Sequence, residues 1–263
     1  MSQEEKPLVL RSHDTRGVVK LTLNRPRAFN ALSEAMLGQL QGELDAIASD
    51  ESVRVVVIAA EGKAFCAGHD LKEMRADPSM KYYERLFAQC SEMMLSIQRL
   101  PVPVIARVQG IATAAGCQLV AMCDLAVASS TARFAVSGVN VGLFCSTPGV
   151  ALSRNVLRKP AFEMLVTGGF ISAQEAKARS LINRVAEPDQ LDAELEKLVA
   201  AIISKPSVAV AMGKEFFYRQ AELAIAAAYD AASQIMACNM MDEAALEGVQ
   251  AFIEKRQPRW NKE

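Results

Sequence analysis

The chain has 263 residues, of which 51% are hydrophobic and 22% charged, and its formal net charge at pH 7 is −1. This balance is typical of a globular protein with a large core, and it lacks the basic excess of a protein that binds nucleic acid or an anionic membrane surface. No apolar run approaches the roughly 18 residues of a membrane-spanning helix, and the first residues, MSQEEKP, lack the pattern of a signal or transit peptide. We therefore predict a cytoplasmic protein with neither a nucleic-acid nor a membrane partner.

Cysteine and histidine usage bears on metal and redox chemistry. The six cysteines lack C-x-x-C spacing, which predicts reduced, mostly buried thiols. His13 and His69 are the two histidines, and no carboxylate cluster has the spacing of metal ligands. Neither G-x-G-x-x-G nor a Walker A loop occurs. We expect no metal and no bound nucleotide cofactor.

Hydrophobic patterning predicts alternating strands and helices through the first 190 residues. Ser33 is a suitable N-cap for the first helix, and Ser172-Ala173-Gln174-Glu175 is a capping box for the last. The predicted strands are 8–12, 18–23, 53–58, 104–108, 124–129 and 182–185, and the predicted helices are 33–48, 86–100, 117–122, 148–157 and 172–180, with 134–145 as a loop. Such repeats indicate an α/β protein with a parallel-rich sheet and helices outside it.

From residue 191 onward the pattern is helical only, with predicted helices at 191–204, from 207 to 229 and beyond, and at 242–255. The alanine content of this region favours long helices. Its apolar residues exceed what a tail can bury by itself, which indicates a subunit interface. Packing on the chain's own sheet is an equally good interpretation of the periodicity.

Two turns of small residues follow buried strands, Cys66-Ala67-Gly68-His69-Asp70 and Gln109–Gly116. Small residues leave backbone N–H groups uncovered at a helix start, where the amides can bind an oxyanion. In the alternative interpretation the first of them is an ordinary turn in which Gly68 supplies an unusual φ.

Several short motifs occur in collinear order across nearly the whole chain. They are Asn24-Arg25-Pro26-x-Ala28-x-Asn30-Ala31-Leu32, Ala64-Phe65-Cys66-Ala67-Gly68-His69-Asp70-Leu71, Gln109-Gly110, Ala115-Gly116-Cys117, Cys123-Asp124-Leu125-Ala126, Thr167-Gly168, Ser172–Ala176 and Ala251–Arg256. Together they resemble the crotonase, or enoyl-CoA hydratase/isomerase, superfamily. Residues 68–71 and 141–149 look closest to its branch called enoyl-CoA hydratase domain-containing protein 3.

The resemblance implies a crotonase (ClpP/crotonase-like) α/β fold. Residues 1–190 would form a spiral core of repeated ββα units with an acyl-CoA site, and residues 191–263 a helical region that trimerises, often giving a dimer of trimers. The implied substrate is a coenzyme A thioester, with no separate cofactor. The expected partners are therefore an acyl-CoA and further copies of the chain.

The resemblance also assigns site residues. The family's two oxyanion donors match the backbone N–H groups of His69 and Ala115, and two fixed amides stabilise the charge that develops as a thioester becomes an enolate. The family's coenzyme A contacts match positions along the whole chain, of which the last two approach from a neighbouring subunit in some members: Arg25, Ala28, Ala64, Cys66, Gly68, Asp70, Leu71, Phe252 and Lys255.

The chain departs from the hydratases at their catalytic glutamates. A hydratase needs two carboxylates facing one water, one to accept a proton and one to donate a proton to the α-carbon. The first glutamate matches Gln118, whose amide cannot take a proton at neutral pH, and the second matches Gly138. Ordinary hydration is therefore doubtful.

Three hypotheses follow. In the first, the chain is an acyl-CoA lyase or isomerase of the family in which Gln118 orients a group instead of abstracting a proton. In the second, it resembles the methylmalonyl-CoA decarboxylase branch, which also has Gly-His-Asp after the first turn; decarboxylation forms an enolate without a base, and the His69 side chain would take part. In the third, it is a noncatalytic CoA-ester binder or an assembly protein.

Overall fold

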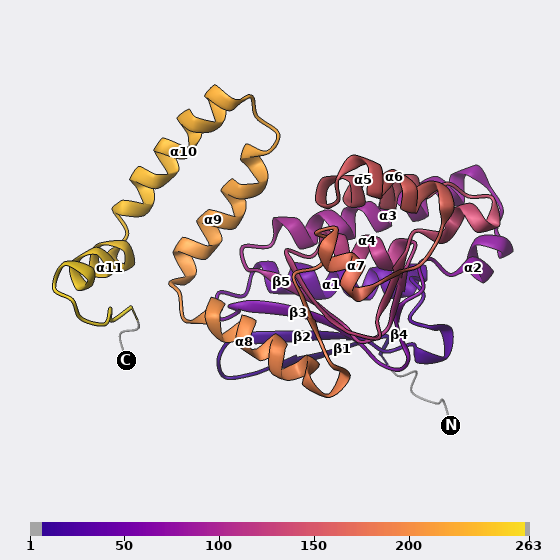
Figure 1. Cartoon of the computed structure of the whole chain (residues 1–263), viewed down its shortest axis with the longest axis horizontal. Helices are drawn as coiled ribbons and strands as arrows, with labels where there is room; N and C mark the ends of the chain where they lie inside the picture. The colour runs from indigo at the N-terminus through magenta and orange to yellow at the C-terminus, as the bar shows by residue number, and fades with distance from the viewer. Residues whose placement is uncertain (1–6, 261–263) are drawn as a thin grey trace.

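The computed structural model describes residues 7–260, and its centre is a six-stranded sheet in the order β1-β2-β3-β5-β7-β10 (Figure 1). β1 and β2 are antiparallel, and every other neighbouring pair is parallel. The strands are β1 (Val9–His13), β2 (Val18–Leu23), β3 (Val55–Ala60), β5 (Val104–Val108), β7 (Leu125–Ser129) and β10 (Arg184–Ala186).

A second, four-stranded sheet has the order β4-β6-β8-β9. Its short strands are β4 (Ala64–Cys66), β6 (Ile111–Thr113), β8 (Arg133–Ala135) and β9 (Ile171–Ser172). In the sequence, β3 is followed by β4, β5 by β6 and β7 by β8, so each of these strands of the first sheet precedes one of the second. A helix follows each pair. This repeated ββα order confirms the predicted fold class.

Helices cover both faces of the large sheet. In the first 190 residues they are α1 (Glu34–Ala48), α2 (Leu71–Ala76), α3 (Met80–Arg99), α4 (Ala115–Met122), α5 (Ser146–Asn155), α6 (Arg158–Thr167) and α7 (Ala173–Ala178), with 3₁₀ turns at Pro26–Ala28, Ser137–Val141 and Pro188–Gln190. Ser33 caps α1 by accepting a hydrogen bond from the Met36 amide, and the Ser172 capping box opens α7. Both predicted caps are therefore confirmed.

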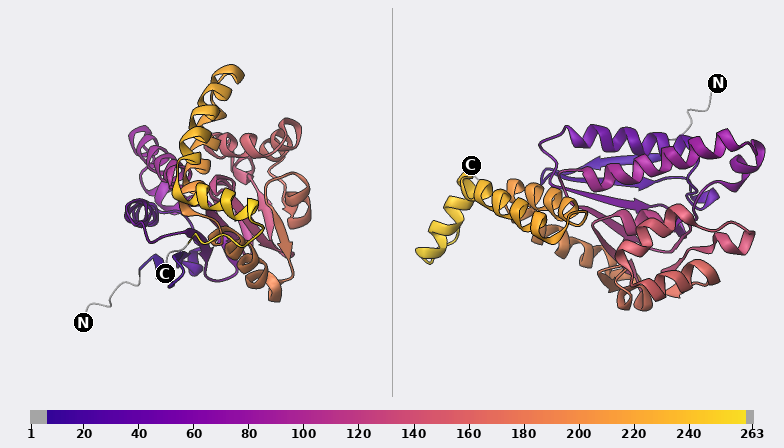
Figure 2. Two further views of the ribbon diagram at one scale, coloured as in Figure 1. Left: turned by 90° about the vertical axis from the view of Figure 1, so that its left-hand side faces the viewer. Right: turned by 90° about the horizontal axis from the view of Figure 1, so that it is seen from above.

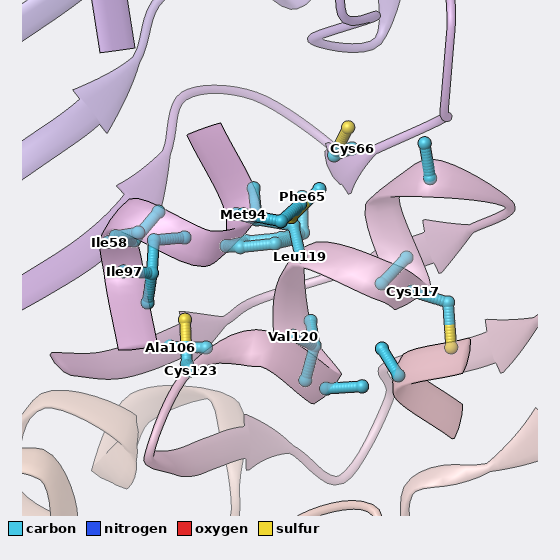
Figure 3. Close-up of a cluster of buried hydrophobic side chains, with 14 of the residues drawn as sticks. Ile58, Phe65, Cys66, Met94, Ile97, Ala106, Cys117, Leu119, Val120 and Cys123 are labelled. Atoms are coloured by element: carbon cyan, nitrogen blue, oxygen red, sulfur yellow. The ribbon is translucent and has the colours of Figure 1, made fainter. Parts of the chain in front are cut away.

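Side chains alternate across β3, so its two faces enter different clusters. Val56 and Ile58 join the main core with α1, α3 and α4, whereas Val55 and Val57 join a cluster on the opposite face. Figure 3 shows the main core around α4, where side chains from β3, β4, β5 and α3 meet; the thiols of Cys66, Cys117 and Cys123 point into different parts of it. Five of the six cysteines are buried.

The helical region after residue 190 divides its packing. α8 (Leu191–Ile203) covers the outer face of the sheet with Leu191, Leu195 and Val199. The next helices, α9 (Ser207–Gln220), α10 (Ile225–Met240) and α11 (Glu243–Ile253), extend away from the body (Figures 1 and 2). The boundary at residue 190 stays a prediction, although α8 itself packs on the sheet.

A buried ion pair joins α9 to the body. Lys214 Nζ lies 2.7 Å from Asp124 Oδ2 and also donates hydrogen bonds to the carbonyls of Ile97 and Val102. Tyr218 donates a 2.6 Å hydrogen bond to the other carboxylate oxygen of Asp124. Burial lowers the pKa of Lys214, against the opposing effect of Asp124. Asp124 thus holds the end of α4, the start of β5 and α9 together.

The structure differs from the sequence predictions in several elements. The predicted helix at 207–229 is broken at residues 221–224, because helix propensity is a weak guide to helix ends and neither Gly nor Pro marks the break. The predicted loop at 134–145 contains part of β8 and a 3₁₀ turn, and α6 was not predicted. Within residues 7–260, none of the helices is both long and apolar enough to cross a membrane.

Candidate active site

In the first predicted turn, the backbone N–H of His69 points away from the backbone segment that pairs with this turn. Gly68 has φ +92°, a left-handed conformation that favours glycine. Leu32 forms a parallel bridge with His69, in which Leu32 N–H donates to the Gly68 carbonyl and Asp70 N–H donates to the Leu32 carbonyl. In such a bridge the N–H of His69 points to the other side, and it has no hydrogen-bond partner among the described residues.

The second turn presents the amide of Ala115 at the start of α4. Ala114 has φ 50° and ψ −122°, a costly conformation for alanine that is held by the hydrogen bond from its N–H to the Ala135 carbonyl. Ala115 is the first residue of the helix, where amides lack an intrahelical partner and the helix dipole is positive. Its N–H also has no partner within residues 7–260.

The two turns pack backbone against backbone. A Cβ atom added to Gly68 would lie 2.9 Å from the Ala114 Cβ and 3.3 Å from the Ala115 nitrogen. A Cβ atom added to Gly116 would lie 2.1 Å from the Cys66 carbonyl oxygen. Glycine at both positions therefore permits the close approach that brings the two unpaired amides to one place.

A cavity of about 330 Å³ opens at these turns. One wall comes from the first turn, α2 and α3, and the opposite wall comes from the 3₁₀ turn after β8 and the start of α5. Its lining residues are Ala67, His69, Leu71, Met74, Phe87, Ala114, Ala115, Ser137, Gly138, Val141, Leu143, Phe144, Cys145, Ser146, Thr147 and Pro148. None of them is Asp, Glu, Lys or Arg, so the cavity is mostly apolar and carries no fixed charge.

The two positions predicted to match the family's glutamates differ in the structure. Gln118 is buried, with 6% of its surface exposed, and its Oε1 lacks a hydrogen-bond partner among the described residues, but Gln118 is not among the cavity-lining residues. Gly138 lines the cavity, and a Cβ atom there would lie 2.5 Å from the Leu143 carbonyl oxygen and 2.6 Å from Cys145 Sγ. This backbone has no room for a side chain at position 138.

Several predicted coenzyme A contacts lie near the first turn. Arg25 pairs with Asp70 at 2.6 Å, and Asp70 also caps α2 by accepting hydrogen bonds from the amides of Lys72 and Glu73. Burial by itself raises the pKa of Asp70, but Arg25 and these amides outweigh it and hold the pKa below its ordinary value. Leu71 is 56% exposed and lines the cavity.

The remaining predicted coenzyme A contacts lie in β4, in the first 3₁₀ turn and at the end of α11. Ala64 and Cys66 are buried in β4, and burial raises the pKa of the Cys66 thiol to about 12. Ala28 is half-buried in the 3₁₀ turn at Pro26–Ala28. Phe252, which is 84% exposed, and Lys255 lie at the end of α11, at the opposite end of the molecule from α2 (Figure 1). Within one chain they do not approach the cavity.

The sequence analysis missed the apolar walls. Phe87 was expected only as part of the helix at 86–100, Met74 had no assigned site role, and residues 134–145 were expected to be a loop. The exposed apolar residues Val141, Leu143 and Phe144 in that loop were the available signal, because contiguous exposed apolar surface marks a binding site.

Within residues 7–260, no group of three His, Cys, Asp or Glu residues is placed to bind a metal ion.

Comparisons with known proteins show the family of the chain. The sequence model of the enoyl-CoA hydratase/isomerase family matches residues 13–263. The chain belongs to the enoyl-CoA hydratase/isomerase family. A crystal structure of an enoyl-CoA hydratase from Mycobacterium smegmatis is 69% identical, covers 98% of this chain and 100% of that one, and superposes with a TM-score of 0.97.

The predicted branch is also confirmed. The crystal structure of human enoyl-CoA hydratase domain-containing protein 3 is 45% identical, covers 96% of this chain and all of its own, and has a TM-score of 0.93. The rat protein of that name is 46% identical over 258 residues, which are 98% of this chain and 86% of the rat protein. This family member therefore resembles that branch in both sequence and structure.

The predicted cytoplasmic location is contradicted. The relatives of this family member from rat, mouse, Xenopus laevis, human and Danio rerio are all named mitochondrial. The prediction relied on the composition of MSQEEKP, and the residues at the start of the printed sequence do not decide where the protein resides.

Proposed function

We propose that the protein binds an acyl-CoA thioester and stabilises its enolate in an oxyanion hole formed by the backbone amides of His69 and Ala115. The observation that supports this most strongly is the pair of unpaired amides held together at the cavity by the close contact between Gly68 and the Ala114–Ala115 backbone. Amides fixed in this way stabilise negative charge without reorganisation, and losing one such donor typically costs about 3 kcal/mol of transition-state stabilisation.

In this proposal coenzyme A enters with its substrate, and no separate cofactor is required. In this proposal Leu71, which is exposed and lines the cavity, and Arg25, which pairs with Asp70 beside it, contact the coenzyme A part of the substrate. The family name supports a CoA-ester substrate, whereas the choice between lyase and isomerase chemistry is part of the proposal.

Hydration in the manner of a two-glutamate enzyme is expected to be slow. No carboxylate lines the cavity in the described part of the chain, Gln118 is an amide, and Gly138 has no space for a side chain. The cavity also lacks a Lys or Arg to hold the carboxylate of a malonyl-type ester, which favours an uncharged acyl group over the decarboxylase hypothesis.

The proposal includes a homotrimer or dimer of trimers. Support comes from the exposed apolar side chains that α9, α10 and α11 carry: Phe217, Ile225, Tyr229, Met236, Met240, Leu246, Val249, Phe252 and Ile253. A patch of this kind normally marks an interface. Assembly would let Phe252 and Lys255 reach the coenzyme A site of a neighbouring copy, and sedimentation equilibrium would give a monomer mass if the proposal is wrong.

A pair of ligands tests the oxyanion hole directly. Butyryl-CoA carries the thioester carbonyl, and S-butyl-CoA has a methylene group in its place. Two hydrogen bonds of about 1 kcal/mol each predict a roughly 30-fold tighter Kd for the thioester in calorimetry. Equal affinities would refute the oxyanion hole, and rapid loss of enoyl absorbance from crotonyl-CoA would refute the expected slow hydration.

A further inference from the structure

The imidazole of His69 is a polar group left without partners in an apolar wall. Its Nδ1 and Nε2 are both buried and lack a hydrogen-bond partner among the described residues. The ring lies edge-to-face against Phe87, with 5.4 Å between the ring centroids. Buried polar groups in folded proteins are nearly always paired, so two unpaired nitrogens in a residue that lines the cavity indicate that a ligand group supplies the missing partner.

The other polar side chains at the cavity already form hydrogen bonds or are accessible to water. The hydroxyls of Ser137 and Thr113 hydrogen-bond to each other at 2.8 Å, and Cys145 Sγ accepts a hydrogen bond from the Gly138 amide. Ser146 is exposed and Thr147 half-buried, so both can meet water. The His69 ring is therefore the polar side chain of this wall whose nitrogens have no hydrogen bond of good geometry among the described residues, although an interaction with the Leu32 backbone partly opposes the effect of burial on its pKa.

The environment of His69 determines what kind of group it can bind. Burial lowers the pKa of His69 below 6.5, so at neutral pH the ring is uncharged, with one nitrogen donating and the other accepting. With no Asp, Glu, Lys or Arg among the lining residues, a carboxylate or an ammonium group would enter the cavity without a counter-charge. An uncharged hydroxyl or ketone oxygen fits both conditions.

The position of His69 limits where that group lies on the ligand. The backbone amide of the same residue is the proposed donor to the thioester oxygen, and only a few covalent bonds separate it from the ring. We propose that the His69 imidazole is a specificity-determining side chain that hydrogen-bonds an uncharged hydroxyl or ketone oxygen near the thioester, at the β-carbon of the acyl chain. This inference rests on the proposed acyl-CoA binding and adds to it the recognition of the acyl group.

Calorimetry with two matched ligands tests this role. In the unmodified protein, 3-hydroxybutyryl-CoA is expected to bind about five- to tenfold more tightly than butyryl-CoA, the effect of one hydrogen bond. His69→Phe keeps the backbone amide and the aromatic contact with Phe87, and the Kd ratio should fall to about one. His69→Gln retains a donor and an acceptor and should restore part of the preference.

The outcomes separate the two proposals. A Kd ratio that is one in the unmodified protein, or unchanged in His69→Phe, overturns the role of the imidazole while butyryl-CoA binding leaves the proposed function standing. If neither ester binds, both the role of the imidazole and the proposed function are overturned. Malonyl-CoA binding as tightly as butyryl-CoA would contradict the uncharged ligand class, and thermal unfolding of each variant verifies that it is folded.

Discussion

Substituting Gly116 by alanine should push apart the two turns that form the oxyanion hole. The new Cβ atom would lie 2.1 Å from the Cys66 carbonyl oxygen, 2.7 Å from its carbon and 2.8 Å from the Cys66 Cβ. An ordinary carbon–oxygen contact is about 3.3 Å or longer, so α4 has to move about 1 Å away from β4. Both elements are held in the core, where Leu119 and Phe65 are fully buried. Overpacking of this kind costs about 1–3 kcal/mol, and we expect the upper end because the clash is with backbone.

Urea unfolding at neutral pH measures the loss, and Gly42→Ala in α1 is the matched control. A Cβ atom at Gly42 meets nothing within 4 Å, so that variant should gain about 0.5–1 kcal/mol from the lower backbone entropy of its unfolded state. Gly116→Ala should also lose most of the preference for butyryl-CoA over S-butyl-CoA, because the Ala115 amide moves with α4. A Gly116→Ala protein with unchanged stability and unchanged thioester preference would refute the proposed contact between the turns.

Two further predictions concern buried titratable groups. Lys214→Met leaves Asp124 buried without its cation and should lower the free energy of unfolding, measured in urea, by about 3–5 kcal/mol. Lys197→Met removes an exposed ion pair and should change that free energy by less than about 1 kcal/mol. Similar losses in both variants would contradict the stabilising role of the Lys214–Asp124 pair. Because burial holds the pKa of folded His69 below its ordinary 6.5, the unfolded chain binds a proton more readily, so stability should fall as pH drops below about 6.5. His69→Phe should flatten that decline, and an equal pH dependence in the variant and the unmodified protein would show that His69 does not cause it.

Most strands, several helix starts and the presence of two small-residue turns could be predicted from the sequence, because these features depend on local patterns. Ser33 and the Ser172 capping box determine helix ends through side-chain hydrogen bonds to nearby amides. Gly68 was open to two interpretations, and its φ of +92° agrees with both of them. Local patterns did not reveal β4 and β6, whose short strands lie in stretches that were expected to be turns.

Family resemblance added the candidate oxyanion residues, and only the tertiary structure decided their surroundings. The absence of space at Gly138 depends on Leu143 and Cys145, which reach it through the fold of one loop. Gln118 is predicted to match a family glutamate and yet is not among the residues that line the cavity. No local sequence pattern predicts packing contacts of this kind, because they form only when the chain folds.

The sequence by itself determined that the chain is an α/β protein with two turns of small residues, and its resemblance to the family predicted that the two catalytic carboxylates are replaced. Periodicity, capping and residue chemistry act over a few neighbouring residues, so they can be recognised in one dimension. The tertiary structure decided that the two turns touch, that Lys214 on α9 meets Asp124 after α4, and that the His69 ring lies unpaired on an uncharged wall. These facts depend on how distant segments pack, because burial and pairing are properties of the folded chain and not of any single stretch of it.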